Sequence, residues 1–200
     1  MHDLKSVCVY CGSSTGHDPA FVAAADALGV ALAEAGITLV YGGGSLGLMG
    51  RIAHTVLSSG GNVIGVIPQF LHDREVMLRD VSELIITEDM HERKRIMFER
   101  ADGFVALPGG IGTLEEVVEM MTWSQLGQHE KPIVLANIAD FWAPLNDLIV
   151  HMSASGFIRP GWDVSYDVVD DIAEVIPTLT SRQAALHADR SPREAMLRRL

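Results

Sequence analysis

Basic residues are scarce in this 200-residue sequence: 15 Lys and Arg stand against 26 Asp and Glu, which gives a formal net charge of −11. A general nucleic-acid binder needs a basic surface, so this balance argues against that class. The sequence also lacks an apolar run of the roughly 18–20 residues that cross a bilayer, and its first residues, MHDLKSV, do not resemble a signal peptide. We therefore expect a cytoplasmic protein with no membrane or nucleic-acid partner.

Cysteine is equally scarce, and the two that occur, Cys8 and Cys11, form a lone C-x-x-C motif. Redox versions of this motif place the first Cys at the start of a helix, where the dipole lowers its pKa. Here the surrounding SVCVYCG is typical of a β-strand, which points side chains three positions apart to opposite faces. A zinc site would need a second Cys or His pair at suitable spacing, and the histidines are scattered. We expect two buried strand thiols and no metal.

Short continuous apolar runs alternate with longer helical segments along the chain. Strands are expected at 6–10, 37–44, 62–68, 83–87, 103–110, 131–137 and 164–169, and helices at 19–36, 48–60, 90–101, 113–127, 141–155 and 170–180. Continuous Val, Ile and Leu strands separated by helices indicate a parallel sheet that is covered on both faces. The sequence therefore predicts an α/β fold, a doubly wound parallel sheet with helices on both faces.

Ten of the 19 glycines fall in three loops between a predicted strand and the next helix: CGSSTG (11–16), GGGSLGLMG (42–50) and PGGIGT (108–113). Glycine lets a backbone approach a ligand closely, and a following helix N-terminus offers free N–H groups to an anion. Because the strands of a parallel sheet end at one edge, the three loops predict a site for a phosphorylated ligand. The second loop matches the G-x-G-x-x-G dinucleotide fingerprint, but no acid ends the next strand to hold a ribose, which argues against NAD.

The length and the absence of a linker favour one nucleotide-binding domain over residues 1–180. Residues 181–200 differ in charge, because they carry five Arg against Asp189 and Glu194. We expect this segment to form a peripheral C-terminal tail or helix.

Basic residues concentrate at 93–100, where four of the ten Lys and Arg of residues 1–180 occur. Such a run is usually a solvated helix face, here paired with Glu92 and Glu99. Arg93 and Lys94, however, stand near the start of a predicted helix, at the sheet edge that carries the glycine loops. We expect at least one of them to contact the ligand, since Arg binds phosphate or sugar bidentately and Lys binds as a point charge.

The helix after the third loop places three acids, Glu115, Glu116 and Glu119, on one arc of about 100°. Acids in a first turn can simply stabilise the helix dipole. Carboxylates beside a phosphate loop also suit chemistry on a sugar, because they steady an oxocarbenium-like transition state, bind ribose hydroxyls or activate water. We expect a functional role for Glu116 and leave both interpretations open for Glu119. On the same helix, candidate residues for a subunit interface are Met120, Met121 and Trp123.

Several motifs resemble a known family. P-G-G-I-G-T-L-E-E (108–116) is similar to the P-G-G-x-G-T-x-x-E signature of the Lonely-Guy family of cytokinin-activating nucleotide phosphoribohydrolases. The segments 11–16, 42–50 and M-H-E-R-K (90–94) match further family motifs in the family's order, so the resemblance spans roughly residues 5–160. The variable position of the signature is Ile111, which we expect to influence the N6 group that is accepted.

The resemblance implies hydrolysis of the N-glycosidic bond of N6-modified adenosine 5′-monophosphates, which releases a free cytokinin or adenine-type base and ribose 5-phosphate. It implies a Rossmann-like fold, no metal or organic cofactor, and a homodimer with sites near the interface. The family's catalytic pair falls on Arg93 and Glu116. Its nucleotide-binding positions fall on Glu75, Arg93, Lys94, Gly109, Gly110, Ile111, Gly112, Thr113, Leu114, Glu115 and Thr122. The loop residues expected to support the site are Ser13, Gly43, Gly44 and Met49.

Two other functions compete with hydrolysis. Members of this family often carry the label lysine decarboxylase, a pyridoxal-phosphate chemistry that needs a Schiff-base lysine. Lys5 opens a predicted strand, Lys131 precedes a proline and Lys94 lies in a nucleotide-shaped site, so we reject that function. A nucleotide- or cofactor-binding protein without hydrolytic turnover is the remaining alternative, and the retained Arg93 and Glu116 argue against it. We expect a small purine nucleotide as the partner.

Overall fold

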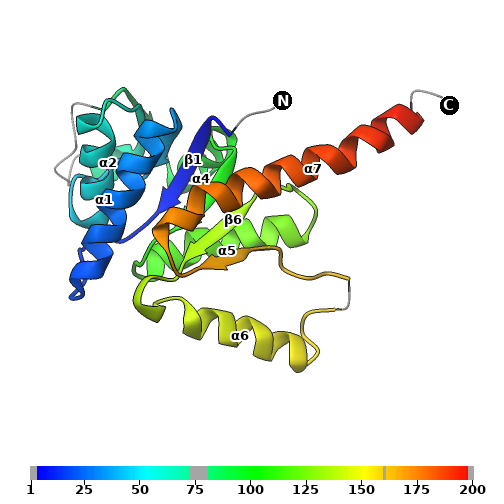
Figure 1. The fold of residues 1–200 in the computed structure, drawn as a ribbon. Coiled ribbons are helices and arrows are strands. Elements are labelled where there is room, and N and C mark those ends of the chain that lie inside the picture. Colours follow the sequence, from blue (N-terminus) through cyan, green and yellow to red (C-terminus); the bar gives the residue numbers. More distant parts are fainter. Residues whose placement is uncertain (1–3, 73–80, 160, 198–200) are drawn as a thin grey trace.

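Strands from the whole length of the chain pair into one parallel sheet in the computed structural model, which describes residues 4–72, 81–159 and 161–197 (Figure 1). The seven strands of the described residues are β1 (Ser6–Tyr10), β2 (Thr38–Tyr41), β3 (Val63–Pro68), β4 (Glu83–Thr87), β5 (Gly103–Ala106), β6 (Ile133–Ala136) and β7 (Asp167–Val169). Their order is β4-β3-β2-β1-β5-β6-β7. The chain thus builds outward from β1 to β4 and then returns to the other side of β1, which confirms the predicted doubly wound sheet and places its switch point between β1 and β5.

Helices cover both faces of the sheet. One face packs against α1 (Pro19–Glu34), α2 (Gly47–Ser58) and α7 (Val175–Leu197). The other packs against α4 (Met90–Glu99), α5 (Ile111–Gln125) and α6 (Ala143–Ala154). Short segments that the sequence did not predict are α3 (Gln69–His72) and the 3-10 turn Ile138–Asp140. The helix predicted over 170–180 begins with a 3-10 turn, Ile172–Glu174, before α7.

Strand β1 shows why continuous apolar runs suit this fold. Val7 and Val9 point to the α1 face, whereas Cys8 and Tyr10 point to the α5 face, and all four are buried. Both cysteines are free and buried on opposite faces, which confirms the expected burial; Cys8 lies in β1, whereas Cys11 directly follows the strand.

The boundaries differ from the predicted ones where glycine and proline begin a loop. The second and fifth strands end at Tyr41 and Ala106, before the glycines that follow them. The last helix begins at Val175, so Pro177 lies in its first turn, where a missing N–H costs no helical hydrogen bond. The described part of the chain contains no helix that is both long and apolar enough to cross a bilayer.

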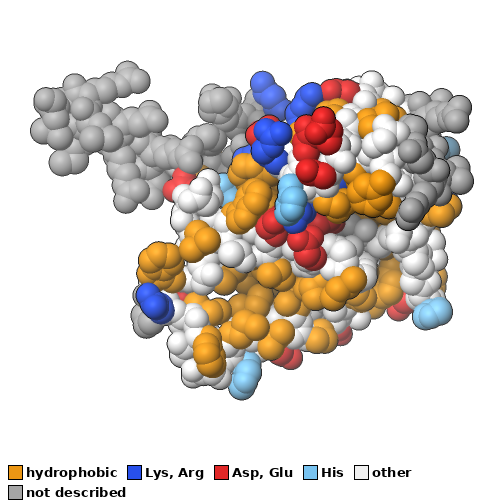
Figure 2. Space-filling view, turned by 180° about the vertical axis from the view of Figure 1, so that it is seen from behind, with side chains coloured by type: hydrophobic (Ala, Val, Ile, Leu, Met, Phe, Trp, Pro, Cys, Tyr) orange, Lys and Arg blue, Asp and Glu red, His pale blue; other side chains and the backbone are white. Residues whose placement is uncertain are grey.

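The proposed interface residues on α5 require a correction. Met120 and Met121 are 1% and 3% exposed and belong to the core beneath α5, and Trp123 packs edge-on against Phe98. The apolar stripe of α5 therefore faces the sheet. Exposed apolar side chains gather instead over α6 and its neighbours, on the face shown in Figure 2.

Candidate active site

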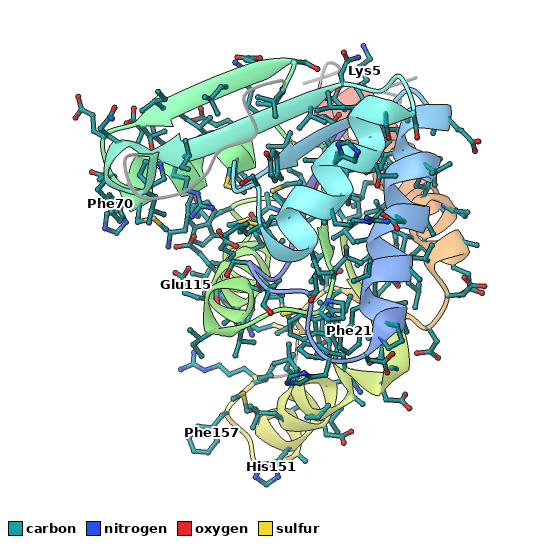
Figure 3. The ribbon with its side chains drawn as sticks, turned by 90° about the vertical axis from the view of Figure 1, so that its left-hand side faces the viewer. Lys5, Phe21, Phe70, Glu115, His151 and Phe157 are labelled. Atoms are coloured by element: carbon teal, nitrogen blue, oxygen red, sulfur yellow. The ribbon has the colours of Figure 1, made fainter. Side chains whose placement is uncertain are left out.

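The three glycine loops meet at the carboxyl edge of the sheet, beside the switch point. The Gly12 N–H donates to the Pro108 carbonyl at 3.1 Å, and the Gly12 carbonyl accepts from the Leu48 and Met49 N–H groups at 3.0 and 3.3 Å. The first loop thus lies between the other two. Phe21 of α1 and Glu115 of α5 lie on opposite sides of this loop cluster (Figure 3).

Close backbone contact explains the glycines of this edge. Gly47 has a φ of +61°, and a Cβ there would collide with the backbone of Ser13. A Cβ at Gly109 would collide with the Thr113 side chain. Gly110 and Gly112, in contrast, face open space at the start of α5, where the first N–H groups of a helix have no helical partner. The adjoining cavity of about 210 Å³ is lined by Gly12, Ser13, Ser14, Thr15, Gly16, Phe21, Leu48, Pro108, Gly109, Gly110 and Phe141.

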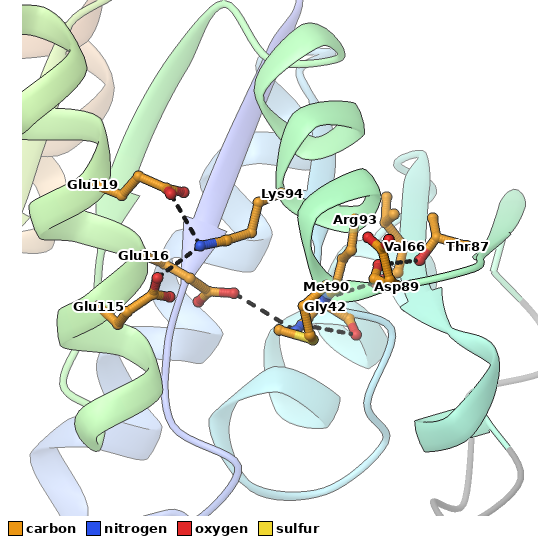
Figure 4. A network of polar contacts seen from close by, with 10 residues as sticks. All are labelled: Gly42, Val66, Thr87, Asp89, Met90, Arg93, Lys94, Glu115, Glu116 and Glu119. Atoms are coloured by element: carbon orange, nitrogen blue, oxygen red, sulfur yellow. Dashed lines mark hydrogen bonds and ion pairs between the residues drawn. The ribbon is translucent and has the colours of Figure 1, made fainter.

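Arg93 is buried and held by backbone carbonyls. The Asp89 carboxylate caps helix α4 by accepting a hydrogen bond from the Glu92 N–H at 2.8 Å. Arg93 lies in the first turn that this cap fixes, and its side chain points toward the sheet. Its Nε donates to the Val66 carbonyl at 3.1 Å and its Nη2 to the Gly42 carbonyl at 3.3 Å (Figure 4). A guanidinium anchored in this way has a fixed orientation.

Glu116 faces this guanidinium from α5. The distance from its Oε1 to Arg93 Nη1 is 3.8 Å, and the two side chains are 13% and 10% exposed. Burial raises the pKa of Glu116 above its ordinary value; Arg93 and Lys94 oppose the rise, whereas Glu115 and Glu119 add to it. A carboxylate with a raised proton affinity beside a fixed cation is suited to catalysis.

Lys94 points toward two acids of α5. Its Nζ donates to Glu115 Oε1 at 2.7 Å and to Glu119 Oε1 at 2.9 Å (Figure 4). Burial lowers the pKa of Lys94, but its hydrogen bonds to the two carboxylates outweigh that effect and raise it. The structure therefore brings Arg93, Lys94 and the three acids into one network between α4 and α5.

The other predicted residues surround this network at different distances. Ile111 is 83% exposed at the start of α5, Thr113 is buried, and the exposed Thr122 donates to the Val118 carbonyl at 2.7 Å one turn beyond Glu119. The remaining described ones are Leu114 on α5, Ser13 in the first loop, Gly43 and Gly44 in the second loop, and Met49 in the first turn of α2. Glu75 lies outside the described residues.

Sequence reasoning missed the anchors of Arg93, because the carbonyls of Gly42 and Val66 carry no side-chain signal. It also missed the apolar wall of the loop cavity, where Phe21 and Phe141 meet edge to face at 5.6 Å. A larger cavity of about 1020 Å³ lies elsewhere, along α7 and the segment 127–133 at the start of β6. It contains none of the predicted site residues. Among the described residues, no group of three or more His, Cys, Asp or Glu is arranged to hold a metal ion.

Known proteins are similar to this chain in sequence. A family model described as "possible lysine decarboxylase" matches residues 49–179. A probable cytokinin riboside 5′-monophosphate phosphoribohydrolase of Oryza sativa subsp. japonica is 52% identical over 76% of this chain and 69% of its own length. The corresponding enzyme of Arabidopsis thaliana is 47% identical over 78% and 74%, and that of Rhodococcoides fascians is 43% identical over 88% and 90%. The chain belongs to this phosphoribohydrolase family.

Solved structures that resemble this phosphoribohydrolase-family chain show the fold. The molybdenum cofactor carrier protein of Chlamydomonas reinhardtii superposes with a TM-score of 0.70 at 22% identity, covering 91% of this chain and 99% of its own. The molybdenum cofactor binding protein of Rippkaea orientalis gives 0.67 at 21% identity over 90% and 98%. These likenesses confirm the Rossmann-like architecture.

Proposed function

We propose that this protein hydrolyses the N-glycosidic bond of adenosine 5′-monophosphates, including N6-modified ones, and releases the free base and ribose 5-phosphate. The observation that carries the proposal is the buried pair of Arg93 and Glu116 beside three joined glycine loops. Relatives that are 43–52% identical over most of the chain bear the name of this activity.

The glycine loops supply the grip on the nucleotide. Backbone N–H groups of residues 109–113, at the N-terminus of α5, hold the 5′-phosphate, and the open space at Gly110 and Gly112 lets an anion approach. Amide groups need no formal positive charge to do this, so the net charge of −11 is no obstacle to one bound nucleotide.

Arg93 and Glu116 supply the chemistry. As the bond between C1′ and the base breaks, its electron pair leaves with the base and positive charge develops on the sugar. Glu116 stabilises that charge or orients the attacking water, and its raised pKa favours acceptance of the water's proton. Arg93 positions the nucleotide and offsets negative charge in the site.

The direct test is to incubate the protein with isopentenyladenosine monophosphate and, separately, with AMP, and to quantify free base by chromatography. Release of base and ribose 5-phosphate in equal amounts is expected. Nucleotide that binds but stays intact would favour the alternative, a binding protein without turnover. The molybdenum cofactor proteins, which share the fold of this chain, are examples of such binding proteins by name. A protein that only binds a nucleotide, however, has little use for the buried Glu116.

The description of the family model names a lysine decarboxylase, but the positions and contacts of the three lysines do not support that activity. Lys94 is bound by two carboxylates, and Lys131 donates to the Phe98 carbonyl at 2.6 Å beside the start of β6. Lys5 is exposed next to β1.

We further infer a homodimer that forms through α6 and through Phe157 and Trp162, which follow it in the chain. None of the residues of α6 is fully buried, and Leu148, Val150 and Met152 are 47%, 59% and 40% exposed. Phe157 and Trp162, which follow α6, are 86% and 50% exposed. Large apolar and aromatic side chains of this kind are typical of interface cores. Light scattering after size exclusion, with Phe157→Asp as a disrupting variant, tests the dimer.

Two further proposals concern organisation. Residues 1–180 form one nucleotide-binding unit, and residues 181–200 are peripheral to it. The cytoplasmic location stays a prediction.

A further inference from the structure

Glu119, for which the sequence left two interpretations open, is joined to the proposed site through Lys94. Its Oε1 accepts from Lys94 Nζ at 2.9 Å, while its Oε2 is buried and has no hydrogen-bond partner among the described residues. A buried carboxylate oxygen without a partner lowers stability. The contact with Lys94 therefore accounts for an ionisable side chain at this position.

Lys94 is shared between Glu119 and Glu115, and its side chain is 12% exposed. Glu116 lies between these two acids in sequence and faces Arg93. Glu116 and Glu119 are three residues apart on α5 and so neighbour one another on the helix surface. The ammonium group and the Glu119 carboxylate act on Glu116 with opposite signs, in surroundings that water screens weakly.

We propose that Lys94 and Glu119 form a positioning pair, in which the carboxylate holds the ammonium group on the α5 side of the site and each of the two opposite charges offsets the effect of the other on Glu116. This inference rests on the proposed function, because it takes Glu116 as the catalytic acid or base. Neither residue of the pair is required to touch the reacting atoms.

The charged groups that face Glu116 come from two helices. Arg93 and Lys94 belong to α4, and Glu115 and Glu119 belong to α5. Strand β1 and its loop add three titratable groups, and burial, the largest cause, raises the pKa of each well above its ordinary range: Cys8, Tyr10 and Cys11. These three stay neutral near pH 7, so the charges of α4 and α5 control Glu116.

The test is a comparison of Glu119→Gln, Lys94→Met and the double variant with wild type. Loss of the Glu119 charge lowers the pKa of Glu116, whereas loss of the Lys94 charge raises it. We expect the titration of the Glu116 carboxyl, followed by ¹³C NMR in the full chain and assigned with Glu116→Gln, to move by about one pH unit in opposite directions. The double variant should return to within a few tenths of a unit of wild type, roughly as the two opposite effects cancel.

A matched control is Arg95→Met, which removes a charge from the same helix at a side chain that is 60% exposed and pairs with Glu92 and Glu99. It should leave the Glu116 titration in place. The pH profile of base release should follow the NMR shifts in each variant. Shifts in the same direction for Lys94→Met and Glu119→Gln, or no shift, would overturn the positioning pair. Absence of base release by wild type would instead overturn the proposed function, since the NMR titration does not depend on turnover.

Discussion

The guanidinium of Arg93 occupies the space that a side chain at Gly42 would need. The Arg93 Nη2 donates to the Gly42 carbonyl at 3.3 Å, and a Cβ on Gly42 would collide with the same guanidinium. Glycine at position 42 therefore leaves room for the Arg93 side chain, in addition to any room it leaves for a ligand.

Gly42→Ala should consequently lower kcat/KM for AMP by roughly 100-fold, because a displaced guanidinium no longer matches the nucleotide. Steady-state kinetics measures the loss, and thermal unfolding confirms that the variant is folded. Kinetics equal to wild type would show that the site tolerates movement of Arg93.

Loss of either member of the proposed catalytic pair should nearly abolish base release. For Arg93→Ala and Glu116→Gln we expect kcat to fall by about 10²–10⁴-fold, the range of removed acid–base or electrostatic catalysis. Arg95→Ala, on the exposed side of α4, serves as the control and should retain full activity. Wild-type rates in both site variants would refute the assignment.

Ile111 should affect the choice of base more than the reaction itself. Its side chain is 83% exposed at the first residue of α5, beside the proposed phosphate grip. Ile111→Ala should reduce the preference for isopentenyladenosine monophosphate over AMP by roughly tenfold, as expected for a lost apolar contact. Leu126→Ala, which removes an exposed side chain just beyond the other end of α5, should leave the ratio unchanged.

The raised pKa of Glu116 also predicts a dependence of stability on pH. The folded state holds the proton of Glu116 more tightly than the unfolded state does, so ionisation of this group lowers the free energy of unfolding as pH rises through the unfolded and then the folded pKa. Glu116→Gln removes that penalty. Its Tm should exceed that of wild type at pH 8, and the difference should shrink toward pH 4. A Tm difference that is constant with pH would contradict the shift.

The sheet and the loop edge were predictable because their signals are local. Each strand is a short Val, Ile and Leu run, each glycine loop directly follows one, and parallel strands end at a common edge. The pairing of Arg93 with Glu116 was implied by the family resemblance, and the same rule supports it, since Arg93 lies in the first turn of α4 and Glu116 in the second turn of α5, two helices that start at this edge.

Long-range contacts were not predictable in this way. The anchors of Arg93 are backbone carbonyls at Gly42 and Val66, 51 and 27 residues away, and a carbonyl leaves no mark on the sequence. The apolar residues of α5 were assigned in part to an interface, because a helical stripe looks the same whether it meets the sheet or another subunit. The contacts of Lys94 with Glu115 and Glu119 of the next helix on that face also join residues 21 and 25 positions apart, and its contact with the ligand stays a prediction.

The anchoring of Arg93 has a consequence for how the molecule matures. The carbonyl of Val66 belongs to β3 and that of Gly42 follows β2, so the guanidinium takes its place only after both strands have joined the sheet and α4 has docked on them. Glu116 in turn arrives with α5, which packs on β1. The arginine–glutamate pair therefore forms only once β1, β2 and β3 have assembled and both α4 and α5 have docked on them.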